Sequence, residues 1–223
     1  MDRPPPLTVL IDLAWHAIEA VPGGRPGSRI AWVGRWCWPY PPALVRRDET
    51  GAPDLRLLDR SVFIDARSQA ERVWTLDQVA RCIGIAAAVG DGRGLAMAES
   101  RRLQLAASVS HQTGVGSGVS ESGVPVLLAR SADEQGELSA ARTRWRVAPA
   151  SEMTGEPHHQ EWAVELLRCK GLRPEEIGSA RRWAVRRDHA TGARCEWNGV
   201  RHAGDGGLAA DVVNGPLVSA RGA

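Results

Sequence analysis

Apolar residues near the start of the chain recur with the period of an α-helix. They follow an i, i+3, i+4, i+7, i+8 pattern, at Leu7, Leu10, Ile11, Ala14, Trp15 and Ile18. This spacing places all of them on one face of a helix. The pattern predicts an amphipathic helix from residue 7 to about residue 20, which ends at Pro22-Gly23-Gly24 because proline and glycine do not continue a helix.

Short apolar runs then alternate with further helical patterns as far as residue 129. Four runs predict buried strands, over residues 29–34, 61–65, 83–89 and 124–129. Ser68 and Glu71 form an S-x-x-E capping box and predict a helix that extends to about Cys82, and a second helix is expected over residues 97–110. The proline-rich segment 36–42 and the Gly/Ser-rich segment 114–123 are expected to be loops. Strands that alternate with helices predict an α/β fold with a mostly parallel sheet flanked by helices.

The later part of the chain has a different pattern. Three segments alternate as antiparallel strands do, over residues 142–148, 162–169 and 182–188, and DHATG at residues 188–192 has the composition of a hairpin turn. From about Asn198 onward the sequence is rich in Gly and Ala and has little periodicity. The sequence therefore predicts one domain over residues 1–192 and a poorly ordered Gly/Ala-rich tail over residues 193–223.

Composition narrows the class of protein. The 28 basic and 26 acidic residues nearly balance, and arginine carries almost all of the positive charge, because Lys170 is the only lysine. The four cysteines are scattered without a CxxC pair, and His158-His159 lack the HExxH spacing of a zinc site. The chain has neither the pattern of a signal peptide nor an apolar run long enough to span a bilayer. We expect a soluble, cytoplasmic protein that holds no metal.

Several stretches, in the same order along the chain, carry a resemblance to a known family. SVFIDARSQAERVWTLDQVARC (residues 61–82) and IGIAAAVGDG (residues 83–92) resemble the strand, helix and Walker B strand of RecA-like proteins. RRLQLAAS (residues 101–108), WAVELLRCKGLRP (residues 162–174) and WAVRRDHATG (residues 183–192) are similar to the ImuA branch of that family. The resemblance covers residues 29–192 and implies a degenerate RecA-like core.

The family's nucleotide-binding residues are largely missing. No G-x-x-x-x-G-K-[ST] P-loop occurs, and the strand and loop that precede the first helix in the family are absent. Because that strand lies inside the family's sheet, either the sheet closes differently or the natural start lies upstream of Met1. Trp36 and Trp38 follow the first strand where the family has a glutamate, and Arg130 stands where it has a glutamine. Asp91 is the remaining Walker B-like residue, and such an aspartate is more often a turn or cap residue than a metal contact.

Two sets of residues are candidates for binding. One set contains arginines near tryptophans, which can contact DNA or a partner but can equally protect a sheet edge: Arg142, Arg144, Arg146, Arg181, Arg182, Arg186 and Arg187. The other set contains aromatic residues close to prolines, which are either interface anchors or packing residues: Trp36, Trp38 and Tyr40. The counterparts of the family's DNA-binding loops, residues 92–98 and 131–141, are short or acidic. This favours a protein partner over filament-type DNA binding, with weak DNA contact as a secondary expectation.

The resemblance implies an accessory role rather than an enzyme with a cofactor. We expect a non-catalytic adaptor in SOS-induced translesion synthesis, with an ImuB-like Y-family polymerase homologue, an error-prone DnaE-type polymerase and RecA as candidate partners. Two alternatives remain. One is a DNA-stimulated ATPase whose P-loop is missing through a wrong start codon, and the other is a SulA-like inhibitor of cell division.

Overall fold

The computed structural model describes residues 5–19, 28–48, 50–108, 123–149, 159–171, 182–188, 194–197 and 208–212. Beyond residue 171 it describes the backbone and the side chains of Trp183 and Val185. The elements in chain order are α1 (Leu7–Glu19), β1 (Arg29–Val33), η1 (Arg35–Cys37), η2 (Pro41–Leu44), β2 (Arg46–Arg47), β3 (Pro53–Asp54), α2 (Arg56–Asp59), β4 (Ser61–Ile64), α3 (Gln69–Ala80), β5 (Ile85–Asp91), α4 (Met97–Ala107), β6 (Val126–Arg130), η3 (Ala132–Glu134), β7 (Thr143–Pro149), β8 (His159–Cys169), β9 (Arg182–Asp188), β10 (Arg194–Trp197) and β11 (Leu208–Val212).

One nine-stranded sheet organises the described part of the chain. Its strand order is β10-β9-β8-β7-β11-β6-β5-β1-β4, and β2 and β3 form a separate two-stranded hairpin. The four strands β4, β1, β5 and β6 are parallel to one another, whereas β11, β7, β8, β9 and β10 pair antiparallel with their neighbours. The α/β architecture with parallel strands flanked by helices, followed by antiparallel strands, is therefore confirmed.

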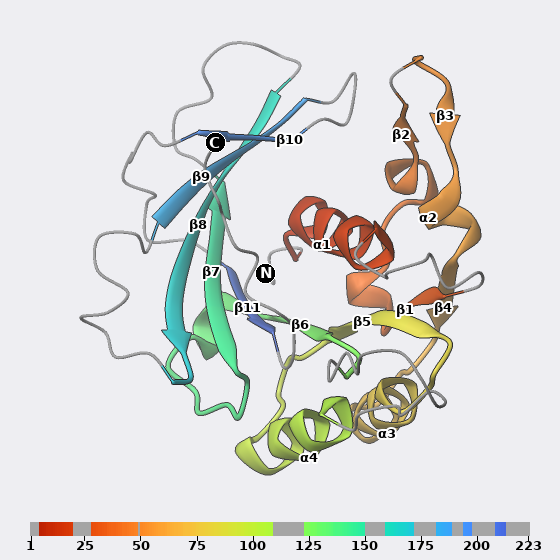
Figure 1. Cartoon of the computed structure of the whole chain (residues 1–223). Helices are drawn as coiled ribbons and strands as arrows, with labels where there is room; N and C mark the ends of the chain where they lie inside the picture. Colours follow the sequence, from red (N-terminus) through yellow and green to blue (C-terminus); the bar gives the residue numbers. More distant parts are fainter. Residues whose placement is uncertain are drawn as a thin grey trace, which may run out of the picture.

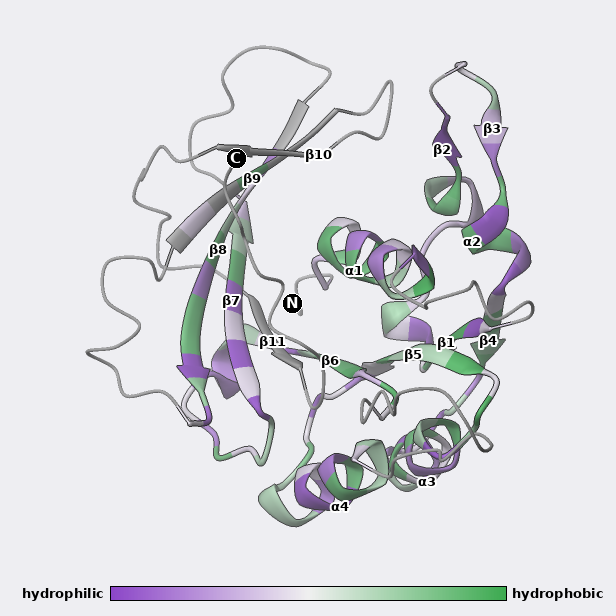
Figure 2. Ribbon diagram, in the orientation of Figure 1, coloured by the Kyte–Doolittle hydropathy of each residue, from purple (hydrophilic) through white to green (hydrophobic). Residues whose placement is uncertain are grey.

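Helices cover both faces of the parallel strands (Figure 1). The apolar face of α1 packs with Ile30 and Trp32 of β1 and with Leu57 of α2, on the face from which η1 also packs. On the opposite face, α3 and α4 pack through Leu76 and Leu103 against the other side chains of the same strands. Hydrophobic and hydrophilic residues alternate along these helices (Figure 2). The two faces of the sheet thus hold two separate hydrophobic cores.

Two local predictions for the first half are confirmed, the buried face of α1 and the capping box of α3. Leu10, Ile11, Ala14, Trp15 and Ile18 are all buried on one side of α1, as their spacing predicts. The capping box also forms at the start of α3, where Ser68 Oγ accepts a hydrogen bond of 3.2 Å from the backbone N–H of Glu71. A Glu71 carboxylate oxygen in turn accepts from the N–H of Ser68 at 3.4 Å. Both contacts satisfy N–H groups that have no partner within the helix.

Two local expectations need correction. The sequence predicts a buried strand at residues 61–65, but β4 (Ser61–Ile64) is the edge of the sheet, and its four residues are only half-buried because one side of an edge strand lacks a neighbour. The segment 36–42 was expected to be an irregular loop, and its residues instead contribute to two short 3₁₀ helices, η1 and η2. The predicted Gly/Ser loop at residues 114–123 lies outside the described residues except for Gly123.

β11, a strand from late in the sequence, joins the parallel and the antiparallel parts of the sheet. β11 lies between β6 and β7 and pairs antiparallel with both, so that Ala210 is opposite Ala129 on one side and Trp145 on the other. β10 extends the other end of the sheet beyond β9. Both strands fall within residues 193–223, where the low periodicity predicted a poorly ordered tail. Because β11 supplies backbone partners to two neighbours, β6 is not left with an open edge.

The lengths of the helices can be compared with the length that a membrane-spanning helix needs. In the part of the chain that the structure describes, the longest helix is α1 with 13 residues, and none is long and apolar enough to cross a bilayer.

Candidate functional site

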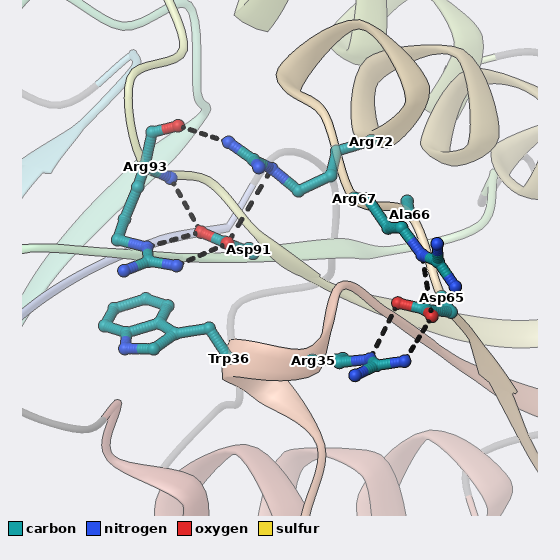
Figure 3. A pocket seen from close by; sticks show the side chains of 8 residues that line it. All are labelled: Arg35, Trp36, Asp65, Ala66, Arg67, Arg72, Asp91 and Arg93. Carbon is teal, nitrogen blue, oxygen red and sulfur yellow. Dashed lines mark hydrogen bonds and ion pairs between the residues drawn. The ribbon is translucent and has the colours of Figure 1, made fainter.

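A hollow opens at the carboxyl ends of three adjacent parallel strands, β4, β1 and β5. Its volume is about 540 Å³, and four arginines, two aspartates, a tryptophan and an alanine line it: Arg35, Arg67, Arg72, Arg93, Asp65, Asp91, Trp36 and Ala66. Figure 3 shows the side chains in two groups, one around each aspartate. We call this hollow the arginine pocket.

Asp91 lies at the end of β5 with only 3% of its surface exposed. One carboxylate oxygen accepts hydrogen bonds from the backbone N–H of Arg93 at 3.1 Å and from Arg93 Nε at 3.0 Å. The second accepts from Arg93 Nη2 at 2.9 Å, and Arg72 Nε lies 3.7 Å from it. The side chain therefore closes a turn onto the next residues, as an aspartate in a turn does. Two guanidinium groups already neutralise its charge.

The backbone before η1 makes room for this arrangement. Gly34 has a φ of 86°, and a Cβ at this position would lie 3.0 Å from Asp91 Cβ and 3.2 Å from Arg72 Cδ. Both the left-handed backbone and the close approach favour glycine. The chain can thus turn out of β1 directly over the end of β5.

The second group surrounds Asp65, which directly follows β4. Arg35 Nε and Nη2 donate to its two carboxylate oxygens at 2.9 and 2.6 Å, and Arg67 Nε adds a contact of 3.3 Å. The bidentate hydrogen bond from Arg35 is the main reason that the pKa of Asp65 lies below its ordinary value. The carboxylate remains ionised and fixes both guanidinium groups at the rim of the arginine pocket.

The three aromatic candidates occupy different environments. The guanidinium of Arg93 lies over the ring of Trp36, 4.2 Å from its centroid, which places Trp36 in the wall of the arginine pocket. Trp38 donates from Nε1 to the backbone oxygen of Trp32 at 3.2 Å and meets Phe63 edge to face, so it packs as part of the fold. Tyr40 is 75% exposed. Whether the three residues form an interface with a partner stays a prediction.

The arginines of β7 are engaged within the protein. Arg144 is buried and donates from Nη1 to the backbone oxygens of Gln135 and Glu137 at 3.0 and 2.6 Å. Arg146 forms an ion pair with Glu165 of β8. Arg142, just before β7, is exposed. Trp145 packs against Trp183 with ring centroids 5.4 Å apart, as the alternation along the strand predicts.

The arginines of the second cluster are placed only by their backbone. Arg182, Arg186 and Arg187 lie on β9, where Arg182 pairs with Glu165 and Arg186 with Glu161 in the register with β8. Arg181 lies outside the described residues. Whether either arginine cluster contacts DNA or a partner stays a prediction.

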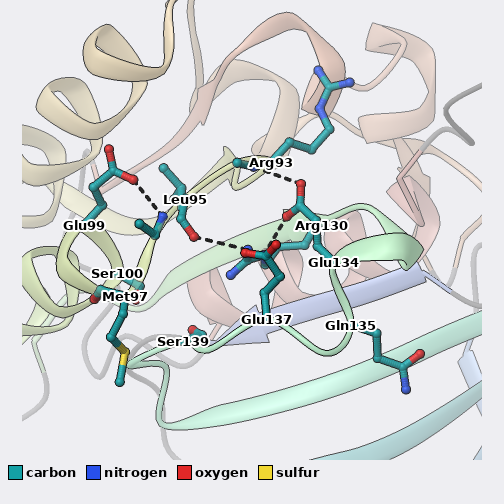
Figure 4. Close-up of polar contacts among 12 residues, drawn as sticks. Arg93, Leu95, Met97, Glu99, Ser100, Arg130, Glu134, Gln135, Glu137 and Ser139 are labelled. Carbon is teal, nitrogen blue, oxygen red and sulfur yellow. Dashed lines mark hydrogen bonds and ion pairs between the residues drawn. The ribbon is translucent and has the colours of Figure 1, made fainter.

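A second polar network, which the sequence did not reveal, links the loops after β5 and β6 (Figure 4). Arg130 is buried, and it donates to Glu134 Oε2 at 2.9 Å and to the backbone oxygen of Leu95 at 3.1 Å. Glu134 Oε1 accepts from the N–H of Gly94 at 2.9 Å, and Ser100 Oγ accepts from the N–H of Ala140 at 2.9 Å. The two segments that correspond to the family's DNA-binding loops, residues 92–98 and 131–141, are therefore bonded to each other.

The arrangement offers guanidinium groups rather than metal ligands. Among the described side chains, no three of His, Cys, Asp and Glu gather as the ligands of a metal ion would. The nearby thiol of Cys37 is buried, and its burial raises its pKa well above the ordinary value, with the charge of Asp91 adding to the effect. Four of the eight residues that line the hollow carry guanidinium groups, which are anion-binding groups in proteins.

Comparison with known proteins gives a relationship over most of the chain. It is 32% identical over 161 residues to "Protein ImuA" of Caulobacter vibrioides, with the same values for strains NA1000 / CB15N and ATCC 19089 / CIP 103742 / CB 15. The similarity covers 67% of this chain and 59% of each relative, so the chain spans less than two thirds of the relatives that it matches. No family model matches, and no solved structure is significantly similar. Over the matched residues the chain is an ImuA-like protein.

Proposed function

We propose that the chain is a non-catalytic, ImuA-like adaptor in DNA damage tolerance. The observation that carries the proposal is the 161-residue similarity to Protein ImuA. The partners that we propose are those implied by this resemblance, an ImuB-like Y-family polymerase homologue, an error-prone DnaE-type polymerase and RecA. The adaptor would act by joining proteins of translesion synthesis in the cytoplasm.

The surroundings of Asp91 support a non-catalytic role. Both oxygens of Asp91 accept hydrogen bonds from the guanidinium group of Arg93, whose positive charge opposes the approach of Mg²⁺ to the same carboxylate. A cation at this position would also face the guanidinium group of Arg72. The end of β1 carries Arg35 and Trp36, neither of which can act as the general base that activates water.

The polar network between the two loops supports a protein partner over DNA. DNA-binding loops use arginines whose guanidinium groups are available to phosphates. Here Arg130 donates to Glu134, and Arg144 donates to backbone oxygens of the segment 131–141. The segment 131–141 also presents carboxylates of Asp133 and Glu137, which repel a phosphate backbone.

Recovery of partners from damaged cells tests the adaptor role. The tagged full chain is expressed in its own host, DNA is damaged, and co-purified proteins are quantified by mass spectrometry against an untagged strain. We expect enrichment of the two polymerases, and a Tyr40→Ala variant compared with Tyr40→Phe reports whether the exposed ring contributes. Recovery of none of the three proposed partners would remove the adaptor proposal.

An ATPase assay tests the non-catalytic part separately. We expect the purified chain to release no phosphate from ATP above the blank, with or without single-stranded DNA. Turnover that an Asp91→Asn variant abolishes would show that the alternative, a DNA-stimulated ATPase, is correct.

A further inference from the structure

The arginine pocket lies where the loops that follow β1, β4 and β5 diverge to opposite faces of the sheet. β1 leads into η1, which packs on the face covered by α1. Its two neighbours, β4 and β5, lead into α3 and α4 on the opposite face (Figure 1). In open α/β sheets, ligands bind at the carboxyl ends of strands where adjacent loops diverge to opposite faces. The position of the pocket is therefore that of a ligand site.

The charges in the pocket do not cancel. Each aspartate is faced by two guanidinium groups, Asp65 by Arg35 and Arg67, and Asp91 by Arg72 and Arg93. Among the residues that line the hollow, four positive and two negative side chains leave an excess of two positive charges. An excess of arginine over carboxylate favours a bound anion, because the local potential raises the concentration of negative ligands.

Several N–H donors in the pocket have no acceptor among the residues that the structure describes. Arg35 bonds Asp65 through Nε and Nη2 and has no partner for Nη1 among the described residues. Arg67 uses only Nε, so neither of its terminal nitrogens is bonded within the described part of the chain. Arg72 Nε is buried and donates no hydrogen bond there, with Asp91 Oδ2 as far as 3.7 Å away. A buried donor without an acceptor is costly and is expected to be satisfied by a ligand or water.

We propose that the arginine pocket binds a phosphate monoester group. Such a group carries two negative charges and three acceptor oxygens, which match the excess charge and the unused donors. Arginine forks match the geometry of carboxylates and phosphates alike, but a carboxylate brings only one charge and fewer acceptors. The half-buried ring of Trp36 forms an apolar wall for the rest of the ester. This activity goes beyond the adaptor role and does not depend on it.

Two sources can supply this group, a small phosphate ester or the 5′-terminal phosphate of a nucleic-acid strand. Calorimetric titration of the full chain with inorganic phosphate tests the shared chemistry. Titration with two oligonucleotides of one sequence, carrying a 5′-phosphate or a 5′-hydroxyl, distinguishes the sources. Preference for the phosphorylated strand assigns the site to nucleic-acid ends, and equal weak binding of both strands alongside phosphate binding assigns it to small esters.

Variants locate the site. Arg67→Gln removes a side chain that is 79% exposed and should leave folding intact. We expect it to weaken phosphate binding about tenfold, as the loss of a charge-assisted hydrogen bond does. Asp65→Asn removes a competing negative charge and should tighten binding. Arg101→Gln on α4 is the matched control, because Arg101 bonds Gln104 outside the pocket and its loss changes the net charge equally.

The outcomes decide the proposal without reference to the adaptor role. Saturable phosphate binding that Arg67→Gln weakens and Arg101→Gln leaves unchanged supports the site. No saturable binding by the folded wild-type chain, or equal weakening by both variants, overturns it. Partner recovery is a separate measurement, so failure of one proposal is distinguishable from failure of the other.

Discussion

Arg130 Nε donates a hydrogen bond of 2.9 Å to Glu134 Oε2, and only 1% of the arginine side chain is exposed. Arg130 ends β6, and the same guanidinium reaches the backbone oxygen of Leu95 in the loop after β5. Glu134 bonds that loop as well, through the N–H of Gly94. The Arg130–Glu134 pair therefore links the loop after β5 to the loop after β6. It also holds the guanidinium group of Arg130 inside the protein, where it is not available to DNA.

Removing the carboxylate of Glu134 should destabilise the fold. A Glu134→Gln variant leaves Arg130 with an incompletely paired buried charge, and we expect the free energy of unfolding to fall by about 3 kcal/mol. Glu137→Gln is the control, because its side chain is 59% exposed and lies 3.8 Å from Arg130, so its loss should cost about 0.5 kcal/mol or less. Urea denaturation measures both. Equal stability of the two variants would contradict the structural role of the pair.

The elements that the sequence predicted correctly depend on local patterns. The buried face of α1 follows from the spacing of residues such as Leu10 and Trp15, and the cap of α3 follows from Ser68 and Glu71 three residues apart. The alternation along β7 likewise predicts that Trp145 lies on the other face of the strand from Arg144 and Arg146, and on that face Trp145 packs against Trp183. Periodicity and capping act over one or two turns, so a short window of sequence contains the information.

The candidate site depended on contacts that such a window does not contain. Asp91 was identified as a candidate, but its pairing with Arg72 joins residues on α3 and β5. Arg144 was a candidate for contact with DNA or a partner, yet its acceptors are the backbone oxygens of Gln135 and Glu137, which no side-chain pattern encodes. β11 was missed because its five residues, LAADV, have no strong strand pattern, and the strand is held by two neighbours. Tertiary context decides strand formation in such segments.

The interior position of β11 makes its backbone sensitive to proline. Ala210 lies between Ala129 and Trp145, and proline there has no N–H for the ladder. We expect Ala210→Pro to lower the free energy of unfolding by about 3 kcal/mol. Ala210→Gly keeps the N–H and should cost about 1 kcal/mol or less. Equal melting temperatures of the two variants in thermal unfolding would contradict the position of β11 between β6 and β7.

The pairing of Asp65 should appear in the pH dependence of stability. Its pKa is lowered from 3.8 in the folded protein, chiefly by the hydrogen bonds from Arg35, so the ionised form stabilises the fold. This contribution is fully present above the unfolded pKa and is lost as the pH falls through the lower folded pKa. Denaturation from pH 6 downward should thus show wild type more stable than Asp65→Asn, with the difference shrinking at acid pH. A difference that stays constant across this range would contradict the ion pair.

Cysteine reactivity tests the packing beneath the arginine pocket. Cys37 is fully buried, and desolvation raises its pKa well above the ordinary 9.0, so almost no thiolate forms at pH 8. Cys82 is exposed after α3 and should react with iodoacetamide under the same conditions. Peptide mass spectrometry of the native chain is expected to show Cys82 alkylated and Cys37 protected, with both modified in urea. The Cys82→Ser variant should leave Cys37 equally protected, and native labelling of Cys37 at the rate of Cys82 would mean that η1 does not pack against the sheet as described.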